Sequence, residues 1–513
     1  MRKTVLIAAA LATTAFAGSL AAASDIAFST GALPDSGRIV VPVSKDGVLS
    51  GEARVADSQA DGALSRAVEA ADFEGGEGST LALYGVAPFD AVLLVGTGEG
   101  LETAADLQDY GAYVAGATSG WSGTVSVAVP QIATIEGDAA HAALGARLGS
   151  YDFGRWKSIE DSEDSDADDG PTLTFHGDGE ATWTGDRAAV AEGVVMARDL
   201  TWTPSNEKTP EWFAEQIRGA FRDVPNTSVR VLDVDEMERM GMGGILGVGK
   251  GSANPPRLIA VRYNSPDYDG APLAFVGKGI TFDTGGISLK PTSDMWKMRQ
   301  DMAGAAAVLS TVKALAMRGA EIDVVAVAAM AENMPGSRAQ KPGDVVETMS
   351  GKTFEIRSTD AEGRLVLTDA LWFAQEEYNP RLAVTVATLT GSVFRALGDD
   401  YAGLFTHDDD LAELFLDAGE VSGEPLWRLP VHESVVEALE GDLADVLNGA
   451  SGNPGASVGA AFVMEWAQDD VPFVHLDIAG KDWSDGQYPT EPTGATGYSV
   501  RLLDEIARRY EAE

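Results

Sequence analysis

The chain contains no cysteine among its 513 residues. This absence excludes disulfide-stabilised scaffolds, thiol nucleophiles and cysteine-ligated zinc. Histidine is also scarce: there are only five, and no two lie close in the sequence, so a zinc site of the HExxH type is absent. Any metal bound by this chain must be held mainly by oxygen ligands, which suits hard or borderline divalent cations.

Basic residues are few compared with acidic ones. The 37 lysines and arginines face 79 aspartates and glutamates, and the formal net charge at pH 7 is −42. Such a surface repels nucleic acid and anionic membranes, so we expect no nucleic-acid partner. The hydrophobic content of 45% is ordinary for a globular protein, and the length suffices for two or three domains.

The first apolar run of the chain is short. It extends from Thr4 to Gly18 after the basic start Met1-Arg2-Lys3, and small residues allow cleavage after about Ala17 or Ala23. A membrane anchor, the alternative, would need about 20 apolar residues. The pattern predicts a signal peptide over residues 1–23, export to the periplasm or the medium, and no stable membrane anchor.

Residues 24–186 are expected to form one α/β domain. The strand-like runs 38–43, 91–96 and 123–129 alternate with alanine-rich helical stretches such as 64–71. The acidic run 160–169 is interpreted as a solvated loop, because it lacks the glycine and the closing glutamate of a calcium-binding EF-hand. A helix over about 185–197 is predicted to lead into a second domain, residues 187–513.

The strongest chemical signal comes from two charged segments. The first reads VGKGITFDTGGISLKPTSDMWKMRQD over residues 276–301, and the second reads STDAEGRL over residues 358–365. Ionised groups buried without partners are costly, and divalent cations shared among the carboxylates would remove that cost. The charged residues of the two segments are Lys278, Asp283, Lys290, Asp301, Asp360, Glu362 and Arg364.

The first segment is expected to follow a short strand. Residues 273–276 predict that strand, with Lys278 at its end, and ligands gather at the carboxyl ends of strands in open α/β sheets. Asp283 comes five residues later, before Gly285-Gly286, and these glycines permit a close approach of the backbone to a ligand.

The other carboxylates are expected near helix starts. Asp301 precedes a predicted helix over residues 302–318, where it could be a metal ligand or merely a cap that interacts with the helix dipole. Asp360 and Glu362 are placed in a turn before a helix that begins at Leu365. Their spacing of two can direct both side chains the same way.

These residues together resemble the leucyl aminopeptidase family, the two-metal exopeptidases of the M17 (cytosol aminopeptidase) type. The resemblance implies a smaller N-terminal α/β (macro-like) domain and a larger C-terminal α/β catalytic domain with a mixed central sheet flanked by helices. It extends from about residue 190 to the C-terminus and includes, in order, ARDL at 197–200, GSANPP at 251–256, ENMP at 332–335, ATLTG at 387–391, HLDIAG at 475–480 and GATG at 494–497.

The resemblance implies a metal-binding role for five residues. Asp283 and Glu362 would bridge two divalent metal ions, Mn²⁺ or Zn²⁺. Asp360 would complete one site, and Lys278 with Asp301 would complete the other. A lysine ligand must be neutral, so the cations have to lower its pKa strongly. Two such metals would acidify a bridging water, polarise the scissile carbonyl and take the α-amine of the substrate.

Two further residues are assigned to catalysis by the same resemblance. Lys290 would stay charged and act as an electrophile toward the carbonyl oxygen. Arg364 would hold a bicarbonate or a water molecule that moves the proton. From the residues alone, an ion pair between Arg364 and a nearby carboxylate is an equal alternative.

Residues that match substrate-pocket positions of the family are Met298, Thr388, Leu389 and Gly391. An adaptable apolar methionine suits a leucine-like side chain, although a methionine on a helix is more often part of the core. The resemblance also implies peptide substrates and a homo-hexamer.

The chain departs from the family pattern at two positions. Ser358 stands where the family usually has asparagine, and Lys481 replaces a small hydroxyl residue. All seven metal and catalytic positions are present, so the expected protein is an exported, metal-dependent leucyl aminopeptidase.

Three alternatives remain. Gly455–Gly459 fits the GxSxG pattern of serine hydrolases, with Ser457 as nucleophile and His475 further on, but a loop precedes it where a nucleophile elbow needs a strand. Another two-metal hydrolase, such as a phosphatase, would need basic groups beyond Lys290 and Arg364. A catalytically silent structural or binding protein would be expected to have lost a ligand.

Overall fold

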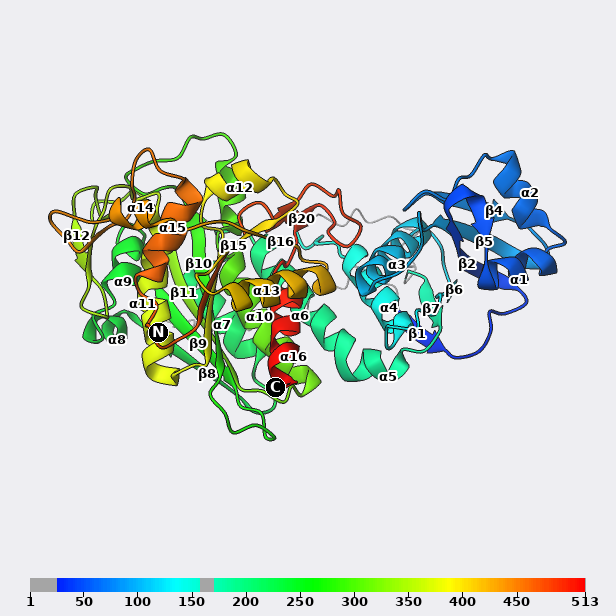
Figure 1. The fold of residues 1–513 in the computed structure, drawn as a ribbon, viewed down its shortest axis with the longest axis horizontal. Helices are drawn as coiled ribbons and strands as arrows, with labels where there is room; N and C mark the ends of the chain where they lie inside the picture. The colour runs from blue at the N-terminus through cyan, green and yellow to red at the C-terminus, as the bar shows by residue number, and fades with distance from the viewer. Residues whose placement is uncertain (1–24, 157–169, 513) are drawn as a thin grey trace, which may run out of the picture.

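The structure is a computed structural model that describes residues 25–156 and 170–512. The chain forms two lobes, a smaller one from the N-terminal part of the described chain and a larger one from the remainder (Figure 1). The predicted signal peptide and the acidic run 160–169 lie outside the described residues.

A mostly parallel sheet forms the centre of the smaller lobe. Its order is β1-β7-β6-β2-β5-β4, with β3 paired to β2, and only β3 and β4 run antiparallel to their neighbours. The predicted strands and helix of this region are therefore confirmed. The elements are β1 (Ile26–Ser29), β2 (Gly37–Ser44), η1 (Lys45–Gly47), β3 (Val48–Leu49), α1 (Gly51–Gln59), α2 (Ala63–Ala70), β4 (Thr80–Tyr84), β5 (Phe89–Gly96), α3 (Ala104–Thr118), β6 (Thr124–Ala128), α4 (Asp138–Gly149) and β7 (Thr172–His176).

The larger lobe contains a mixed eight-stranded sheet in the order β16-β15-β18-β14-β10-β11-β9-β8. Its middle strands β18, β14, β10 and β11 are parallel, and β9 and β8 continue the sheet antiparallel. The strands are β8 (Thr227–Leu232), β9 (Arg257–Tyr263), β10 (Leu273–Asp283), β11 (Val324–Asn333), β14 (Leu382–Ala387), β15 (Ala402–Phe405), β16 (Leu426–Arg428) and β18 (Phe473–Asp477). Small sheets contain β12 (Val345–Glu347), β13 (Thr353–Glu355), β17 (Val446–Leu447), β19 (Trp483–Ser484) and β20 (Gly494–Ala495).

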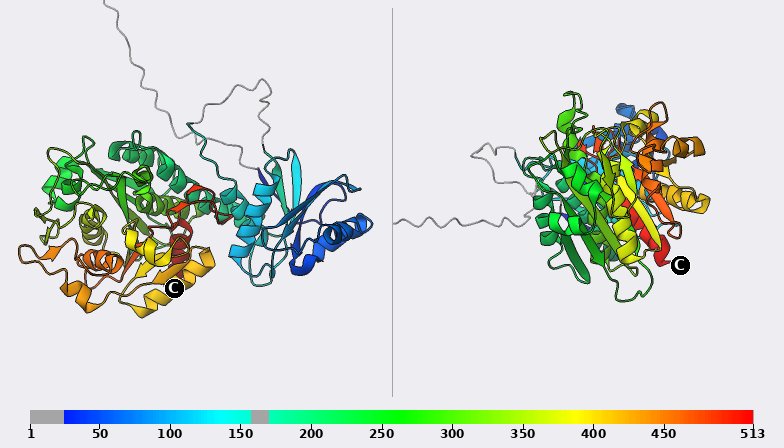
Figure 2. Two further views of the ribbon diagram at one scale, coloured as in Figure 1. Left: turned by 90° about the horizontal axis from the view of Figure 1, so that it is seen from above. Right: turned by 90° about the vertical axis from the view of Figure 1, so that its left-hand side faces the viewer.

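Helices cover both faces of this sheet (Figure 2). Along β10, Leu273 and Phe275 belong to the core that includes α6 and α10, whereas Ala274 and Val276 belong to the core that includes α9 and α11. This alternation explains why buried parallel strands are apolar throughout. The helices are α5 (Glu180–Thr182), η2 (Trp183–Arg187), α6 (Ala188–Trp202), α7 (Pro210–Ala220), α8 (Val234–Arg239), α9 (Gly243–Gly249), η3 (Met295–Gln300), α10 (Ala303–Arg318), α11 (Glu362–Tyr378), α12 (Gly391–Leu397), α13 (Asp409–Ser422), α14 (Glu433–Glu437), α15 (Gly455–Met464) and α16 (Val500–Glu511).

Small residues bring α10 unusually close to the sheet. A Cβ at Gly277 of β10 would lie 2.5 Å from Cα of Ala305, and a Cβ at Gly304 would lie 2.1 Å from the carbonyl oxygen of Val386 in β14. Side chains therefore cannot be added at these contacts without moving the helix away from the strands. This packing fixes the start of α10, and with it Asp301, two residues before the helix.

A buried arginine joins the two lobes. Arg198 of α6 donates hydrogen bonds to the carbonyl oxygens of Leu148 in α4 (2.7 Å), Thr490 (2.6 Å) and Thr496 (2.8 Å). Because the guanidinium is only 1% exposed, each of these bonds replaces solvation that the group has lost. The contact holds the smaller lobe against two loops of the larger one.

Two predicted boundaries differ from the structure. The strand predicted over residues 273–276 continues to Asp283, so Lys278 lies in the middle of β10 and not at its end. Glycine is required at positions 277 and 279 of this strand because α10 and β11 leave no room for side chains there. The helix predicted from Leu365 already begins at Glu362, which is its first residue and not part of the preceding turn.

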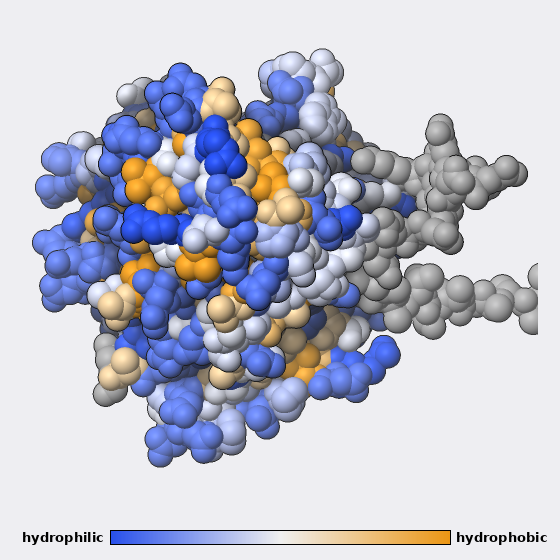
Figure 3. All heavy atoms as spheres, turned by 90° about the vertical axis from the view of Figure 1, so that its right-hand side faces the viewer, coloured by the Kyte–Doolittle hydropathy of each residue, from blue (hydrophilic) through white to orange (hydrophobic). Residues whose placement is uncertain are grey.

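Among the described residues, no helix combines the length and the apolar character needed to cross a bilayer. The outer face of the smaller lobe carries hydrophilic residues interspersed with small apolar patches (Figure 3). Exposed apolar side chains of this lobe include Val48, Val55 and Tyr84.

Asp369 of α11 gives a pH-dependent contribution to stability that can be tested. Its carboxylate accepts hydrogen bonds from the backbone N–H groups of Ile245 (3.0 Å) and Met349 (2.9 Å), and burial raises its pKa to about 7. A raised carboxyl pKa means that unfolding releases a proton between about pH 4 and pH 7. The contribution is therefore largest below pH 4 and is lost as the pH rises to about 7.

The substitution Asp369→Asn removes this titration. The free energy of unfolding of the wild type, relative to the variant, should fall by roughly 3 kcal/mol between pH 4.5 and pH 7.5. Urea unfolding across this pH range measures the difference. The exposed Asp269→Asn provides the control for loss of one charge, and a pH-independent difference for Asp369→Asn would contradict the assignment.

Candidate metal centre and active site

Charged side chains from separate elements meet near the carboxyl end of β10. Lys278 lies within this strand and Asp283 is its last residue, whereas Asp301 follows η3. Asp360 lies in the turn before α11, and Glu362 opens that helix. The carboxyl ends of parallel strands are where open α/β sheets bind ligands, so this location favours a functional site.

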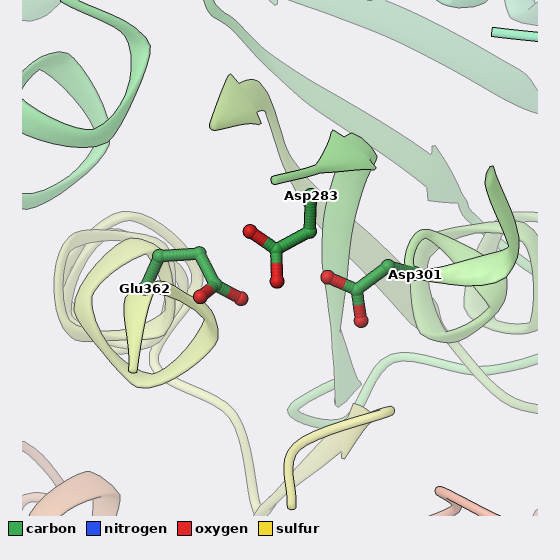
Figure 4. A group of neighbouring side chains, drawn as sticks. All are labelled: Asp283, Asp301 and Glu362. Carbon is green, nitrogen blue, oxygen red and sulfur yellow. The ribbon is translucent and has the colours of Figure 1, made fainter. Parts of the chain in front are cut away.

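Three carboxylates point toward one another in this cluster (Figure 4). Asp283, Asp301 and Glu362 each offer an oxygen, and these three oxygens lie within 4.8 Å of one another. The three residues are 1%, 6% and 2% exposed. Three buried carboxylates this close would repel each other strongly if no cation were shared among them.

The ammonium group of Lys278 contacts two of the three carboxylates. Its Nζ lies 2.6 Å from Oδ1 of Asp301 and 3.0 Å from Oε1 of Glu362, and it donates to the carbonyl oxygen of Thr388 at 2.7 Å. Close approach to α11 is possible because Gly363 has no side chain: a Cβ there would lie 2.5 Å from Cε of Lys278.

The second lysine connects the trio to the fourth carboxylate. Nζ of Lys290 lies 2.8 Å from Oδ2 of Asp283 and 2.6 Å from Oδ1 of Asp360. Two lysines against four carboxylates leave these six groups with two formal negative charges when all are ionised.

The local charges shift the pKa values of these groups in different directions. Burial, together with the neighbouring charge of Glu362, raises the pKa of Asp283 to about 6. Burial also disfavours the ionised form of Glu362, but Lys278 and Lys290 outweigh it and lower the pKa of this carboxyl. Burial alone would lower the pKa of both lysines, yet the surrounding carboxylates raise both above the ordinary value.

The arrangement fits divalent cations. Oδ2 of Asp301 and Oε2 of Glu362 are buried and have no hydrogen-bond partner in the structure. Buried carboxylate oxygens are normally paired, and hard or borderline cations prefer oxygen donors of this kind. The residues present can therefore hold metal ions, provided that Lys278 gives up its proton when it becomes a ligand.

Asn333 is a polar contact of this site that the sequence analysis did not single out. Its Nδ2 donates to Oδ1 of Asp283 (2.7 Å) and to the carbonyl oxygen of Thr359 (3.0 Å). Asn333 ends β11 directly beside Asp283 in the parallel register. A prediction that β10 and β11 pair in parallel would have identified Asn333 as the neighbour of Asp283.

A loop after β14 lies on the other side of the cluster. The hydroxyl of Thr388 donates to Oδ1 of Asp301 at 2.7 Å. Asp477, to which the sequence analysis gave no role beyond its place in the HLDIAG motif, accepts hydrogen bonds from Leu389 N (3.0 Å) and from the hydroxyl of Thr390 (2.7 Å). The predicted pocket residues Thr388 and Leu389 are thereby fixed next to the carboxylates.

The remaining predicted pocket residues lie on neighbouring elements. Met298 is part of η3, three residues before Asp301, and Gly391 is the first residue of α12. Helix α15 packs against the same loop, since a Cβ at Gly459 would lie 3.0 Å from Cδ2 of Leu389.

The contacts of Asp301 and Arg364 bear on the structural alternative that was open for each. Asp301 does not cap α10, whose N-cap is Met302 without a side-chain bond; its carboxylate receives bonds from Lys278 and Thr388. Arg364 is buried and donates through Nη1 to the carbonyl oxygen of Asn448 at 2.9 Å. This partner is a backbone oxygen and not the carboxylate of an ion pair.

The serine hydrolase alternative has no structural support. Ser457 is the third residue of α15 and is buried, and Nδ1 of His475 lies 2.8 Å from the hydroxyl of Thr385. A nucleophile elbow places its serine between a strand and a helix, and a loop precedes α15.

Comparisons with known proteins point in the same direction as the geometry. Residues 195–504 match the family described as "Cytosol aminopeptidase family, catalytic domain", and residues 40–160 match its N-terminal domain. A probable cytosol aminopeptidase of a Chelativorans species is 39% identical over 494 residues, which cover 95% of this chain and 99% of the relative. Another from Rickettsia bellii is 43% identical over 373 residues, covering 72% of this chain and 74% of the relative.

Solved structures show the same two-domain arrangement. A mutant of tomato leucine aminopeptidase has a TM-score of 0.85 and 32% identity, with 96% of this chain and 97% of that chain covered. The bottromycin maturation enzyme BotP in complex with Mn has a TM-score of 0.80 and 32% identity, with coverage of 93% and 99%. The predicted fold class is confirmed by these likenesses.

The prediction of export is wrong. The relatives at 39–43% identity are named cytosol aminopeptidases, including one from Caulobacter vibrioides that covers 92% of this chain. The prediction rested only on two basic residues followed by a short run of small and apolar residues. This pattern is one of composition, and nothing in the fold requires it. It falls outside the described residues.

The glycine beside Lys278 provides a test of the cluster. In Gly363→Ala the new methyl group would lie 2.5–2.7 Å from Cε, Cδ and Nζ of Lys278 and would displace the lysine from the carboxylates. We expect Mn²⁺ affinity, measured by calorimetry, and aminopeptidase activity each to fall about tenfold or more. Gly116→Ala on α3, where the added methyl group would meet nothing within 4 Å beyond the backbone of its own helix, should leave both unchanged. Equal behaviour of the two variants would contradict a role for this contact.

Proposed function

The chain belongs to the cytosol aminopeptidase family and is a metal-dependent aminopeptidase that acts on the N-termini of peptides; we propose that it removes leucine-like residues with two divalent cations. The observation that supports this most directly is the buried trio Asp283, Asp301 and Glu362, in which two carboxylate oxygens lack any partner. Such a donor set has no evident use in a protein that binds no metal.

We assign five residues to the two cations. Asp283 contacts Lys290, Glu362 contacts Lys278, and each offers an oxygen within 4.8 Å of the other members of the trio, which supports a role for both in holding the two cations. Asp360 completes one site, and Lys278 with Asp301 completes the other. When bound, the cations supply Lewis acidity that activates water and polarises the scissile carbonyl.

Lys290 is the proposed electrophile for the carbonyl oxygen of the substrate. Its side chain keeps 23% exposure, so it faces accessible space, and the carboxylates around it keep it charged. A fixed ammonium group next to the reacting carbonyl stabilises negative charge as it develops on the oxygen.

Arg364 is proposed to hold bicarbonate or water that moves a proton. Its guanidinium is buried, and its Nε has no partner in the structure, so this donor is available to an anion. No carboxylate of the described residues lies within ion-pair distance of the guanidinium, and the charges of Glu362 and Asp477 act on it only from further away.

We propose Mn²⁺ or Zn²⁺ as the metals, because both accept oxygen and nitrogen donors. The similarity to BotP, which was solved in complex with Mn, supports manganese. The proposed substrate pocket contains Met298, Thr388, Leu389 and Gly391, and a leucine-like side chain would contact its apolar members.

Two structural proposals accompany the function. We propose a domain division at residues 186 and 187, within the helical segment 180–202 that connects the lobes. We also propose a homo-hexamer, as expected for this family. Light scattering of the purified chain would test the assembly.

Hydrolysis of leucine-p-nitroanilide tests the proposed function. Purified protein is treated with a chelator and then supplied with Mn²⁺ or Zn²⁺. We expect the added metal to restore cleavage of the free-amine substrate, whereas the N-acetylated substrate stays uncleaved. Absence of turnover by a folded protein with either metal would contradict the proposal.

The variant Lys290→Ala tests the catalytic assignment. We expect kcat to fall about 100-fold or more because charge stabilisation is lost, with KM changed by no more than a few-fold. Mn²⁺ binding measured by calorimetry should persist. The surface variant Lys341→Ala, which loses only an exposed ion pair with Asp344, should retain wild-type activity. An unchanged kcat for Lys290→Ala would exclude the electrophile role.

A further inference from the structure

Asn448 makes an unusual set of contacts with the segment that leads to Asp360. Its Oδ1 accepts hydrogen bonds from the backbone N–H groups of Arg357 (2.6 Å) and Ser358 (3.2 Å), and its Nδ2 donates to the carbonyl oxygen of Ser358 (2.7 Å). The residue is completely buried. The side-chain amide thus satisfies three backbone groups next to the metal-binding turn.

These contacts extend a short pairing of strands. β17 pairs in parallel with β13, and the N–H of Asn448 donates to the carbonyl oxygen of Glu355 at 3.0 Å. After this point the side chain of Asn448 takes over from the backbone as the partner of residues 357 and 358. The chain is therefore held in one position up to two residues before Asp360.

The same residue also holds the guanidinium of Arg364. Its carbonyl oxygen accepts the hydrogen bond from Nη1 at 2.9 Å. The side chain of Asn448 thus fixes the segment that leads to Asp360, and its backbone carbonyl fixes the guanidinium of Arg364.

We propose that Asn448 is a positioning residue that sets the metal-binding turn carrying Asp360 in a fixed relation to Arg364. This inference rests on the function proposed above, because it gives Asp360 and Arg364 their roles. Asn448 touches neither substrate nor metal; it acts through the backbone of Ser358 and through the guanidinium.

The chemistry of the contacts requires an amide at this position. Two N–H groups need an acceptor and one carbonyl needs a donor, and a carboxamide is a side chain that provides both ends. An aspartate would keep the acceptor but would place a negative oxygen against the carbonyl of Ser358. A serine or an alanine would leave backbone groups buried without partners.

The contacts also account for the tolerance of serine at position 358. The backbone of Ser358 is bound on both its N–H and its carbonyl by Asn448, so the turn does not depend on the side chain of residue 358. The Ser358 hydroxyl only accepts a hydrogen bond from the N–H of Asp360 at 3.2 Å. Replacement of the usual asparagine therefore leaves the position of the turn intact.

Gln375 offers a matched control. It is also a buried amide of the larger lobe: its Nε2 donates to the carbonyl oxygens of Leu371 (3.2 Å) and Trp466 (2.9 Å), and its Oε1 accepts from Gln468 N (2.8 Å). It lies 13 residues beyond Glu362 in α11, more than three helical turns away. Asn448→Asp and Gln375→Glu thus make the same chemical change at two buried amides.

The experiment compares full-length wild type, Asn448→Asp and Gln375→Glu in calorimetric Mn²⁺ binding, in kcat and KM for leucine-p-nitroanilide, and in thermal unfolding. For Asn448→Asp we expect Mn²⁺ affinity and kcat each to fall about 10- to 100-fold, the range typical of residues that support metal ligands. KM should change by no more than a few-fold. Gln375→Glu should lower the unfolding temperature while it keeps wild-type affinity and kcat.

A stability loss for Asn448→Asp with unchanged Mn²⁺ affinity and kcat would overturn the inference, because it would show a purely structural role. If Asn448→Asp does not fold, Asn448→Ser, which adds no charge, is measured in its place against the same criteria. Failure of the proposed function is distinguishable: in that case the wild type itself would bind no Mn²⁺ and cleave no substrate.

Discussion

Uncompensated negative charge in a dry site is the constraint on which the active region depends. Asp283, Asp301 and Glu362 come together where water cannot screen them, and the two lysines neutralise only part of the charge of the surrounding carboxylates. A fold that assembles such a group must hold it rigidly, because each carboxylate gains by moving apart from the others. The packing around the site can be understood as the means by which this separation is prevented.

Rigidity comes from contacts in which the backbone itself is the neighbour. Gly277 and Gly304 bring α10 against β10 and β14, and this contact fixes Asp301, two residues before α10. Gly363 lets the stem of Lys278 lie directly on α11. Larger residues at these positions would push the elements apart by more than the tolerance of a metal–ligand distance, which is about 0.2 Å.

The sequence predicted most of the charged cluster and little of what holds it. Lys278, Asp283 and Glu362 could be found because each lies in a short charged segment among glycines. Asn448 and Asp477 could not, because each acts on residues about 90 positions away along the chain. The α/β fold of the smaller lobe followed from alternating apolar runs, and that of the larger lobe followed from the family resemblance. The position of Lys278 within β10 depended on packing from α10 and β11, which no local pattern records. The predicted export followed from composition alone, with no structural constraint to support it.

The departure at position 358 shows where the family's site can vary. A side chain can be exchanged without loss where the backbone is already fixed by another residue, and Asn448 binds both polar backbone groups of Ser358. At Asn448 itself no such substitute exists, because its side chain is the fixed partner and it is completely buried. Exchange is therefore expected at residues that face the substrate and lie on a fixed backbone, and not at the buried amides and glycines that fix it. Differences in specificity can then arise in this fold without disturbing the charge balance on which catalysis depends.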